Sequence, residues 1–524
     1  MVGRTPDGCI VSTTADPPAA GVARRRFRLD SSCRRTGAGR VLIGGSPLRV
    51  LTLSVGGAAV IDALQRDGEV EVRTAAMTRL LDRLTDLGII HPMAAASDVA
   101  ASDVAASDVA ASDVAASDVW QATERWTAAV TVVTPCKDEL PRHPRWSCAS
   151  VIVDDGSAPP LAPPAGEGAS DDPDQQPRPA PTLVRLPRNM GPGGARDAGL
   201  ERVDTPFVAF VDADVEVDET ALASLTHWFD DPRVAMVAPR IRAMAAPGAL
   251  AAFESIRSPL DLGAEPARVA PTTRVSYVPA AVLVCRAEAL RAIGGFDASL
   301  RYGEDVDLVW RLVAAGWRCR YDPSVTALHR TRPTLRAWAT QRFRYGTSAA
   351  PLARRHVGAL APVRMSGWSA ATWAPVVAGF PLVGALIGAG TSLALVRKLP
   401  QVAPRESLRL AGLGNLYAGR LWCETLSRAW WPIAAMAAVT SRRLRPMVVG
   451  AWLVPIVLDG RVLRRDRPPI DPLRFALLHL LDDLAYGAGV WVGAWRERSA
   501  AALLPSFESW PPREGSTAGG TQQS

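Results

Sequence analysis

The sequence has few cysteines, and no two of them form a CxxC pair. Seven are scattered without regular spacing over 524 residues, at positions 9, 33, 136, 148, 285, 319 and 423. This pattern indicates neither a zinc site nor a disulfide framework, so we expect reduced thiols. The N-terminus also lacks a basic start followed by an apolar run, and it therefore predicts no secretory signal. We expect the main domain to lie on the cytoplasmic side.

The sequence also lacks a nucleic-acid-binding signature, although its formal net charge is +7. Its conspicuous basic residues flank apolar stretches in the C-terminal third, at Arg397–Lys398, Arg442–Arg445 and Arg461–Arg467. This placement favours an anionic membrane surface over a nucleic-acid groove. We expect no nucleic-acid partner.

The chain is too long for one ordinary core, and composition divides it into six segments. The tandem Ala-Ala-Ser-Asp-Val repeat from Ala95 to Val119 matches no solenoid period, so we interpret it as a low-complexity linker. The predicted segments are a disordered start (1–25), a small α+β domain (26–93), the repeat linker (94–120), an α/β domain (128–335), a helical, membrane-associated region (336–500) and a disordered tail (501–524).

The small domain has the size of a winged helix. Two β-rich runs, 40–43 and 48–53, surround a Gly-Gly-Ser turn and predict a hairpin. Ser54 is placed to cap a helix that reaches Leu64, and apolar residues at helical spacing predict a second helix over 74–87.

The α/β domain is expected to hold a largely parallel sheet. Four short β-branched runs, of the kind buried in such sheets, predict its strands at 129–134, 150–153, 182–186 and 207–211. The insert 158–181 is crowded with Pro, Gly and Asp, and it predicts a surface loop.

The apolar C-terminal region contains one long run, Thr372–Val396, without an ionisable residue. Its length suffices to span a bilayer, and we expect it to do so. The alternative is a pair of helices, because Pro375, Gly379 and Pro381 can split the run. The runs 430–440 and 447–458 are too short to span and predict interfacial helices.

Two carboxylates, Asp212 and Asp214, directly follow the buried-type strand 207–211. Open α/β sheets bind ligands at the carboxyl ends of their strands, and carboxylate oxygens suit Mg²⁺ or Mn²⁺. A bare Asp-x-Asp is common, but its place after a strand predicts a metal that grips a diphosphate. His329 is a candidate third ligand.

Three further segments carry polar side chains that suit a nucleotide site. Asp154 and Asp155 follow the second strand, and a Gly-rich bend with Arg196 opens a helix. The bend is neither a P-loop nor a GxGxxG fingerprint, which excludes kinase and dehydrogenase interpretations. The opposite side of the site is predicted at the end of the first strand, from Pro135, Lys137 and Asp138.

The general base is predicted within Gly303–Leu308, where three carboxylates stand in four residues at a helix start. They are Glu304, Asp305 and Asp307. A helix N-terminus attracts acidic side chains by itself, but a carboxylate aimed at an acceptor hydroxyl can also speed its reaction by roughly 10²–10⁴.

Together these spaced motifs resemble the family-2 glycosyltransferases from Ala129 to about Tyr345. The resemblance implies a GT-A nucleotide-sugar-binding fold, a UDP-sugar donor and inversion at the anomeric carbon. It implies that Asp305 is the catalytic base, that Asp138, Asp154 and Asp155 contact the nucleoside, and that Asp212 and Asp214 hold the metal and diphosphate. On the acceptor side, Gln341, Arg344 and Tyr345 are similar to the Gln-x-x-Arg-Trp signature of processive members, with Tyr in place of Trp.

A narrower resemblance is to the glycosyltransferases of mycofactocin systems. It rests on a PqqD-like small domain ahead of the family-2 domain, the segment Arg344–Ala353 and an apolar C-terminal region. It implies glucosylation of a peptide-derived redox cofactor, and from the apolar C-terminal region we expect the enzyme at the cell membrane. Two alternatives stay open: elongation of a cell-envelope polysaccharide or glycolipid, and a binding module without activity.

Overall fold

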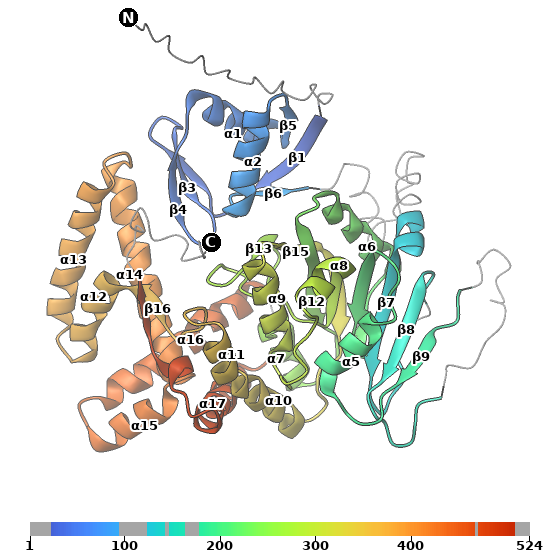
Figure 1. Cartoon of the computed structure of the whole chain (residues 1–524). Coiled ribbons are helices and arrows are strands. Elements are labelled where there is room, and N and C mark those ends of the chain that lie inside the picture. Colours follow the sequence, from blue (N-terminus) through green and yellow to red (C-terminus); the bar gives the residue numbers. More distant parts are fainter. Residues whose placement is uncertain (1–22, 94–122, 142–145, 163–177, 467–469, 509–524) are drawn as a thin grey trace, which may run out of the picture.

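The computed structural model describes residues 23–93, 123–141, 146–162, 178–466 and 470–508. They form a small N-terminal unit, a sheet-centred unit and a helical region, which pack against one another (Figure 1). The repeat linker and nearly all of the start predicted to be disordered fall outside the described residues. The tail predicted from 501 begins instead with ordered structure, because Ser506–Glu508 pairs as a parallel strand with Arg364–Ser366.

The N-terminal unit consists of two small sheets and two helices. Its hairpin and both helices agree with the sequence prediction: Ser54 Oγ accepts a hydrogen bond from Gly57 N at 3.1 Å, and Thr74 caps the second helix in the same way. The strands are ordered β5-β1-β6 and β2-β3-β4. The elements are β1 (Ala23–Leu29), β2 (Arg34–Thr36), β3 (Val41–Gly44), β4 (Arg49–Thr52), α1 (Val55–Asp67), β5 (Glu69–Val72), α2 (Ala75–Asp86) and β6 (Ile90–Pro92).

The sheet-centred unit is built on nine strands in the order β11-β15-β12-β14-β10-β7-β8-β9, with β13 paired to β15. Its strands are β7 (Val130–Cys136), β8 (Ala149–Asp154), β9 (Thr182–Arg185), β10 (Phe207–Val211), β11 (Val215–Glu216), β12 (Val234–Ala243), β13 (Ala267–Val269), β14 (Val282–Arg286) and β15 (Arg318–His329). Its helices are α5 (Gly191–Leu200), α6 (Glu219–Ser224), the 3₁₀-helix η2 (Leu225–Asp230), α7 (Ala249–Arg257), α8 (Ala287–Ala292) and α9 (Glu304–Ala314).

The sheet is mixed, which corrects the expectation of a largely parallel one. The four predicted strands are parallel neighbours, but β14 pairs antiparallel with both β10 and β12. The strand β14 reads as a continuous apolar run because both of its faces are buried, so its pattern cannot reveal its direction. Separate apolar clusters fill the two faces of the sheet.

The helical region follows the sheet. It consists of α10 (Leu335–Thr347), α11 (Ala349–Arg355), β16 (Arg364–Ser366), α12 (Gly367–Val377), α13 (Pro381–Lys398), α14 (Pro404–Ser427), α15 (Trp431–Thr440), α16 (Arg445–Asp466), α17 (Pro472–Arg496), η3 (Ala501–Leu503) and β17 (Ser506–Glu508).

The run Thr372–Val396 is not one helix, so its prediction as a single spanning segment is wrong. It divides between α12 and α13, which pack side by side as a helix pair. The break lies at Gly379, whose φ of +89° suits glycine, and Pro381 starts the next helix. Among the described residues only α17 is long and apolar enough to cross a membrane.

Helix α17 is packed into the molecule through close glycine contacts with α10. A Cβ on Gly346 would stand 2.1 Å from the carbonyl oxygen of Tyr486, and one on Gly489 would stand 2.0 Å from that of Phe343. Side chains larger than hydrogen would therefore push the two helices apart. This packing places α17 beside the sheet-centred unit.

The N-terminal unit touches both other parts of the chain. Arg28 pairs with Glu265 of the sheet-centred unit at 3.0 Å, and Arg34 pairs with Glu406 of α14 at 3.0 Å. A small apolar cluster joins Val41 and Ile43 of β3 to Leu399 between α13 and α14. The unit therefore bridges the sheet and the helical region.

Candidate active site

The strand β10 delivers two carboxylates to the carboxyl edge of the parallel strands, as predicted. Asp212 accepts a hydrogen bond from Arg196 Nη2 at 2.6 Å, while Asp214 Oδ2 lies 3.5 Å from His329 Nε2 and 3.8 Å from Arg332 Nη2. Burial and the charge of Asp214 raise the pKa of Asp212. Burial also opposes ionisation of Asp214, but His329 and Arg332 lower its pKa below the ordinary value.

Asp212 and Asp214 are placed to bind a divalent cation that also contacts a ligand in the cavity. Asp212, Asp214 and His329 all line one cavity of about 940 Å³. Among the described residues no three His, Cys, Asp or Glu side chains stand together as a complete metal centre. Two carboxylates that supply hard oxygen donors suit Mg²⁺ or Mn²⁺, with oxygen atoms of a bound ligand or water completing the coordination shell. The role of His329 as a ligand stays a prediction.

The predicted base lies in the same cavity. Gly303, with a φ of +78°, turns the chain into α9, and Asp305 reaches the cavity while its Oδ1 accepts a hydrogen bond from Val306 N at 2.8 Å. Burial raises the pKa of Asp305 and, together with the charge of Asp305, that of Glu304. A carboxylate with a raised pKa is a stronger base than an ordinary aspartate.

Arg196 connects the two groups of carboxylates. It is buried, and its Nη1 donates to Glu304 Oε1 at 3.1 Å while its Nη2 donates to Asp212. This arginine therefore fixes the distance between the Asp-x-Asp segment and the start of α9.

A second cavity of about 590 Å³ adjoins the first at the Asp-x-Asp segment and contains most residues predicted on the donor side. Its lining includes Pro135, Lys137, Asp155, Arg196, Asp212 and Asp214. Asp155 also accepts hydrogen bonds from Met190 N at 2.5 Å and Gly191 N at 3.0 Å, so it holds the N-terminus of α5.

Two other predicted donor-side residues do not line this cavity. Asp154 is buried and accepts hydrogen bonds from Ser157 N at 2.8 Å and Leu161 N at 3.1 Å. Burial opposes its ionisation, yet these hydrogen bonds and Arg185 lower the pKa of Asp154. Asp138, at a φ of +62°, donates its backbone N–H to Ser157 Oγ at 2.8 Å. Both residues shape the loops around the cavity.

The acceptor-side candidates divide in the same way. Gln341, Arg344 and Tyr345 line the larger cavity, and Gln341 Nε2 donates to the hydroxyl of Tyr345 at 3.0 Å. Burial raises the pKa of Tyr345 to about 12. Asp307 does not line the cavity: it is buried and held by Arg311 at 2.7 Å and His356 at 2.8 Å.

Several cavity residues escaped the sequence analysis. Tyr277 and Tyr302 come from loops, while Arg428 and Tyr486 come from the helical region. The guanidinium of Arg428 stacks 4.0 Å from the centre of the Tyr486 ring. The available signal for α17 was its adjacent acidic pair, Asp482 and Asp483, inside an apolar run.

That acidic pair holds α17 against the rest of the site through buried ion pairs. Arg342 of α10 pairs with Glu254 of α7 and, at 2.7 Å, with Asp482. Arg428 pairs with Asp482 at 3.2 Å and Asp483 at 2.9 Å. Although burial opposes its ionisation, the surrounding arginines lower the pKa of Asp482.

Comparisons with known proteins identify the family of the chain. Residues 148–251 match the model of "Glycosyl transferase family 2", and residues 207–441 match that of "Glycosyl transferase family group 2". The chain is 36% identical over 499 residues to the pre-mycofactocin glycosyltransferase of Mycobacterium tuberculosis, covering 92% of this chain and 97% of that protein. It is 29% identical over 199 residues to the succinoglycan biosynthesis protein ExoO of Rhizobium meliloti, covering 35% of this chain and 52% of that protein.

Two solved structures share a more distant likeness. One is a mannosyltransferase of Pyrobaculum calidifontis in complex with GDP-Man and Mn²⁺, with a TM-score of 0.37 and 16% identity over 76% of this chain and 96% of that one. The other is GalNAc-T7 with UDP, GalNAc and Mn²⁺, with a TM-score of 0.28 and 15% identity over 43% of this chain and 51% of that one.

Proposed function

The chain belongs to glycosyl transferase family 2 and is a nucleotide-sugar-dependent glycosyltransferase with a GT-A-like fold, and from this premise we propose that it transfers glucose from UDP-glucose to a peptide-derived redox cofactor in mycofactocin biosynthesis. The similarity to the pre-mycofactocin enzyme supports the acceptor, because it extends over nearly the whole of both chains. The similarity therefore includes the N-terminal unit and the helical region as well as the sheet-centred unit.

The observation that carries the proposed chemistry is the shared cavity of Asp305 and the Asp212–Asp214 pair. Asp305 accepts the proton of the acceptor hydroxyl, and that oxygen forms a bond to the anomeric carbon of the sugar. The bond from this carbon to the diphosphate breaks, and UDP leaves with its electron pair. Because one displacement occurs from the side opposite the leaving group, the anomeric configuration inverts.

Asp212 and Asp214 would hold Mg²⁺ or Mn²⁺, with His329 as the proposed further ligand. When bound, such an ion supplies the counter-charge to the leaving diphosphate. Arg196 keeps Asp212 in place, and it also fixes Glu304 beside the base.

We assign the nucleoside to the smaller cavity, which is lined by Pro135, Lys137 and Asp155. Asp138 and Asp154 support this binding indirectly, because both form hydrogen bonds with Ser157 and so hold the loops beside the cavity. The acceptor then enters the larger cavity beside Gln341, Arg344 and Tyr345. Repeated entry of the product would give oligoglycosylation.

The N-terminal unit is proposed to be a PqqD-like domain that recognises the peptide-derived part of the acceptor. Its two helices and small sheets suit the winged-helix size predicted for it, and its own apolar core holds them together. Its contacts with Glu265 and Glu406 keep it at the junction of the sheet and the helices.

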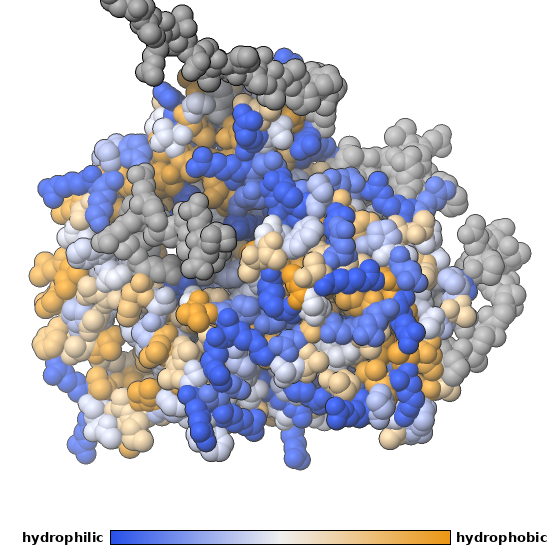
Figure 2. Space-filling model, in the orientation of Figure 1, coloured by the Kyte–Doolittle hydropathy of each residue, from blue (hydrophilic) through white to orange (hydrophobic). Residues whose placement is uncertain are grey.

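The helical region is proposed to lie on the cytoplasmic face of the cell membrane as an interfacial surface. Large apolar side chains are exposed on α12 to α16, including Leu382 (80%), Leu386 (73%) and Val439 (73%). Figure 2 shows such residues gathered at the left, over α12 and α13. Apolar helix faces flanked by arginines suit an anionic bilayer surface.

Fractionation tests this membrane contact. Without detergent, we expect the full chain to sediment with the membrane fraction. Carbonate should release it, because no spanning segment is proposed. A protein that stays in the high-speed supernatant at low and high salt alike would contradict the contact.

Mass spectrometry of small metabolites tests the reaction. The full chain is incubated with UDP-glucose, Mn²⁺ and extracted peptide-derived acceptor, and the expected product gains one or more hexoses. A cell-envelope polysaccharide or glycolipid is the second candidate acceptor, favoured by Gln341, Arg344 and Tyr345 in the cavity, and a hexose found only on that material would replace the proposal. Failure to hydrolyse UDP-glucose even with metal would indicate a binding module.

A further inference from the structure

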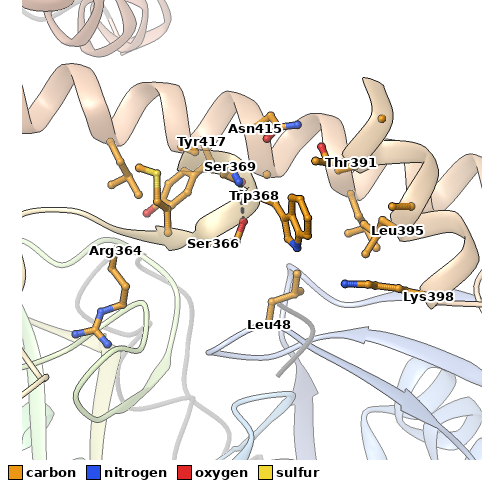
Figure 3. A pocket seen from close by; sticks show the side chains of 18 residues that line it. Leu48, Arg364, Ser366, Trp368, Ser369, Thr391, Leu395, Lys398, Asn415 and Tyr417 are labelled. Carbon is orange, nitrogen blue, oxygen red and sulfur yellow. Dashed lines mark hydrogen bonds between the residues drawn. The ribbon is translucent and has the colours of Figure 1, made fainter. Parts of the chain in front are cut away.

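A separate cavity lies outside the catalytic site, where α12, α13 and α14 meet β16 and the N-terminal unit. It encloses about 380 Å³, and it shares no lining residue with the two cavities of the active site. Figure 3 shows Leu48 of the N-terminal unit reaching the cavity from one side, opposite Trp368. The cavity is thus a junction of two parts of the chain.

The wall of this cavity is apolar and narrow. Leu395, Leu410 and Leu421 provide aliphatic surface, and Gly390 and Gly414 leave room between the helices. None of the residues that line it is acidic. A volume of this size is typical of small-molecule sites, and its lining suits a flexible hydrocarbon.

The mouth of the cavity is cationic and polar. Lys398 is exposed, its Nζ lies 5.9 Å from the centre of the Trp368 ring, and it forms no ion pair with any residue in the described part of the chain. Ser366 and Ser369 also line the cavity, on the other side of Trp368 from Lys398 (Figure 3), and their hydroxyl oxygens are 3.0 Å apart. A cation without a carboxylate partner suits an anionic headgroup.

The cavity lies among helices whose outer faces are apolar. On α13, Leu386 and Leu393 are exposed by 73% and 58%, and on α14 Leu413 and Leu416 are exposed by 48% and 68%. The helices that line the cavity therefore also carry apolar side chains on the surface of the molecule.

We propose that this cavity binds one acyl chain of an anionic membrane lipid, with the headgroup at Lys398. The inference rests on the proposed membrane contact and is independent of the donor and acceptor. Because Leu48 forms part of the wall, a bound chain also contacts the N-terminal unit and holds it against α13. The lipid is then a structural ligand that links membrane contact to the position of that unit.

A pair of glycine variants on α14 tests the cavity. Neither Gly412 nor Gly414 has an atom within 4 Å of a Cβ added to it, but only Gly414 lines the cavity. Gly414→Leu fills the space, while Gly412→Leu adds the same side chain to the same helix outside it. The probe is monomeric palmitoyl-lysophosphatidylglycerol, and binding to the full chain is measured by isothermal titration calorimetry.

We expect the wild type and Gly412→Leu to bind one lipid per chain. The affinity of Gly414→Leu for the lipid should be lower by roughly tenfold or more, because the leucine excludes part of the acyl chain from apolar contact. Equal affinities of the two variants would overturn the proposal. Glycerol 3-phosphate alone should not bind measurably. Saturable binding of this compound would overturn the lipid proposal and indicate a site for a simple phosphate.

Lysine labelling tests the headgroup position. Lys137 and Lys398 are the only lysines of the sequence, and they mark the donor cavity and this cavity respectively. Lysophosphatidylglycerol should protect Lys398 and not Lys137 from an amine reagent, whereas UDP should protect Lys137 and not Lys398. Lys398→Gln should weaken the anionic lipid several-fold and leave lysophosphatidylcholine unchanged, with Arg397→Gln as the control. Protection of neither lysine by the lipid would contradict the assignment.

The two proposals can fail separately. Monomeric lysolipid reports on the cavity without a bilayer, vesicle sedimentation reports on membrane contact, and transfer of glucose reports on the enzyme. Gly414→Leu should retain transfer and vesicle binding while it loses the lysolipid. If Gly414→Leu lost transfer, vesicle binding and lysolipid binding together, circular dichroism would show whether it is folded. A folded protein with all three losses would contradict a lipid site that is independent of the active site.

Discussion

Two clusters of buried charge lie close together in this protein, and they differ in how their charges are balanced. Around α17, arginines and carboxylates alternate, with Arg342 between Glu254 and Asp482 and Arg428 between Asp482 and Asp483. In the cleft, Asp212, Glu304 and Asp305 lie around Arg196. The first cluster lowers the pKa of Asp482, whereas the second leaves those of Asp212 and Asp305 raised.

This difference separates a structural role from a chemical one. A buried carboxylate with two arginines is fully satisfied and holds two elements together. A carboxylate with a raised pKa, such as Asp305, retains affinity for a proton, which the proposed base needs. The same residue types therefore serve the two roles through their neighbours alone.

The largest expected effect is on the catalytic side, with Asp305→Asn. Transfer should fall by roughly 10²–10⁴, because the change removes only the group that accepts the proton. Binding of UDP-glucose, measured by calorimetry, should stay near that of the wild type. If transfer persists near the wild-type rate, the base is another residue, and Glu304→Gln would be measured next.

Asp482→Asn should act on the structural side. Removing this carboxylate leaves the buried Arg342 and the partly buried Arg428 and Arg257 with less compensation, which costs about 3–5 kcal/mol of unfolding free energy. Denaturant unfolding measures the loss. The exposed pair of Arg354 and Glu497 supplies the control, since Glu497→Gln should cost only about 0–1 kcal/mol. Equal losses in the two variants would contradict the structural role of the cluster around α17.

Asp214→Ala should lower metal-stimulated transfer by about 10², a loss typical of one strong electrostatic contact to a developing charge. Binding of UDP should weaken in the presence of Mn²⁺ and change little in EDTA. Full activity of the wild type in EDTA would contradict the proposal that transfer depends on a divalent metal.

The two clusters should also respond differently to acid. The pKa of Asp305 is raised, so its charged form is lost at a higher pH than that of an ordinary aspartate, and transfer should fall as the pH decreases. The pKa of Asp482 is lowered, so its contribution to stability is present above its unfolded pKa and is lost only as the pH falls through the lower folded value. Transfer should therefore disappear while the circular dichroism spectrum is still native. A simultaneous loss of both would contradict this order.

The smallest effect is expected from deleting the repeat Ala95–Val119, which belongs to neither cluster. Transfer and thermal stability should change little, because the repeat carries no residue proposed for the chemistry. A collapse in expression or turnover would mean that the repeat packs against the folded units.

Sequence reasoning reached those parts of the site that depend on local order. The Asp-x-Asp segment follows its strand directly, and the Gly-Glu-Asp turn precedes its helix, so a short pattern suffices to place Asp212, Asp214 and Asp305. Asp154 and Asp155, at the end of their strand, were predicted for the same reason. Their division into a buried residue and a cavity residue depends on Ser157 and the start of α5, and pattern alone does not contain it.

What the sequence missed depends on contacts between distant segments. Tyr486 reaches the cavity because Gly346 and Gly489 let α10 and α17 approach closely. The apolar run Thr372–Val396 has the composition of a spanning helix, but the turn at Gly379 divides it. Hydrophobicity measures transfer from water and does not distinguish a bilayer from a neighbouring helix.

The position of α17 has a consequence for the newly made chain. The sheet and its carboxylates leave the ribosome well before Tyr486, so a nascent protein can assemble the donor side while the acceptor side still lacks a wall. We expect a polypeptide whose translation stops before α17 to lack this wall, so that transfer would begin only after the last long helix has packed against α10.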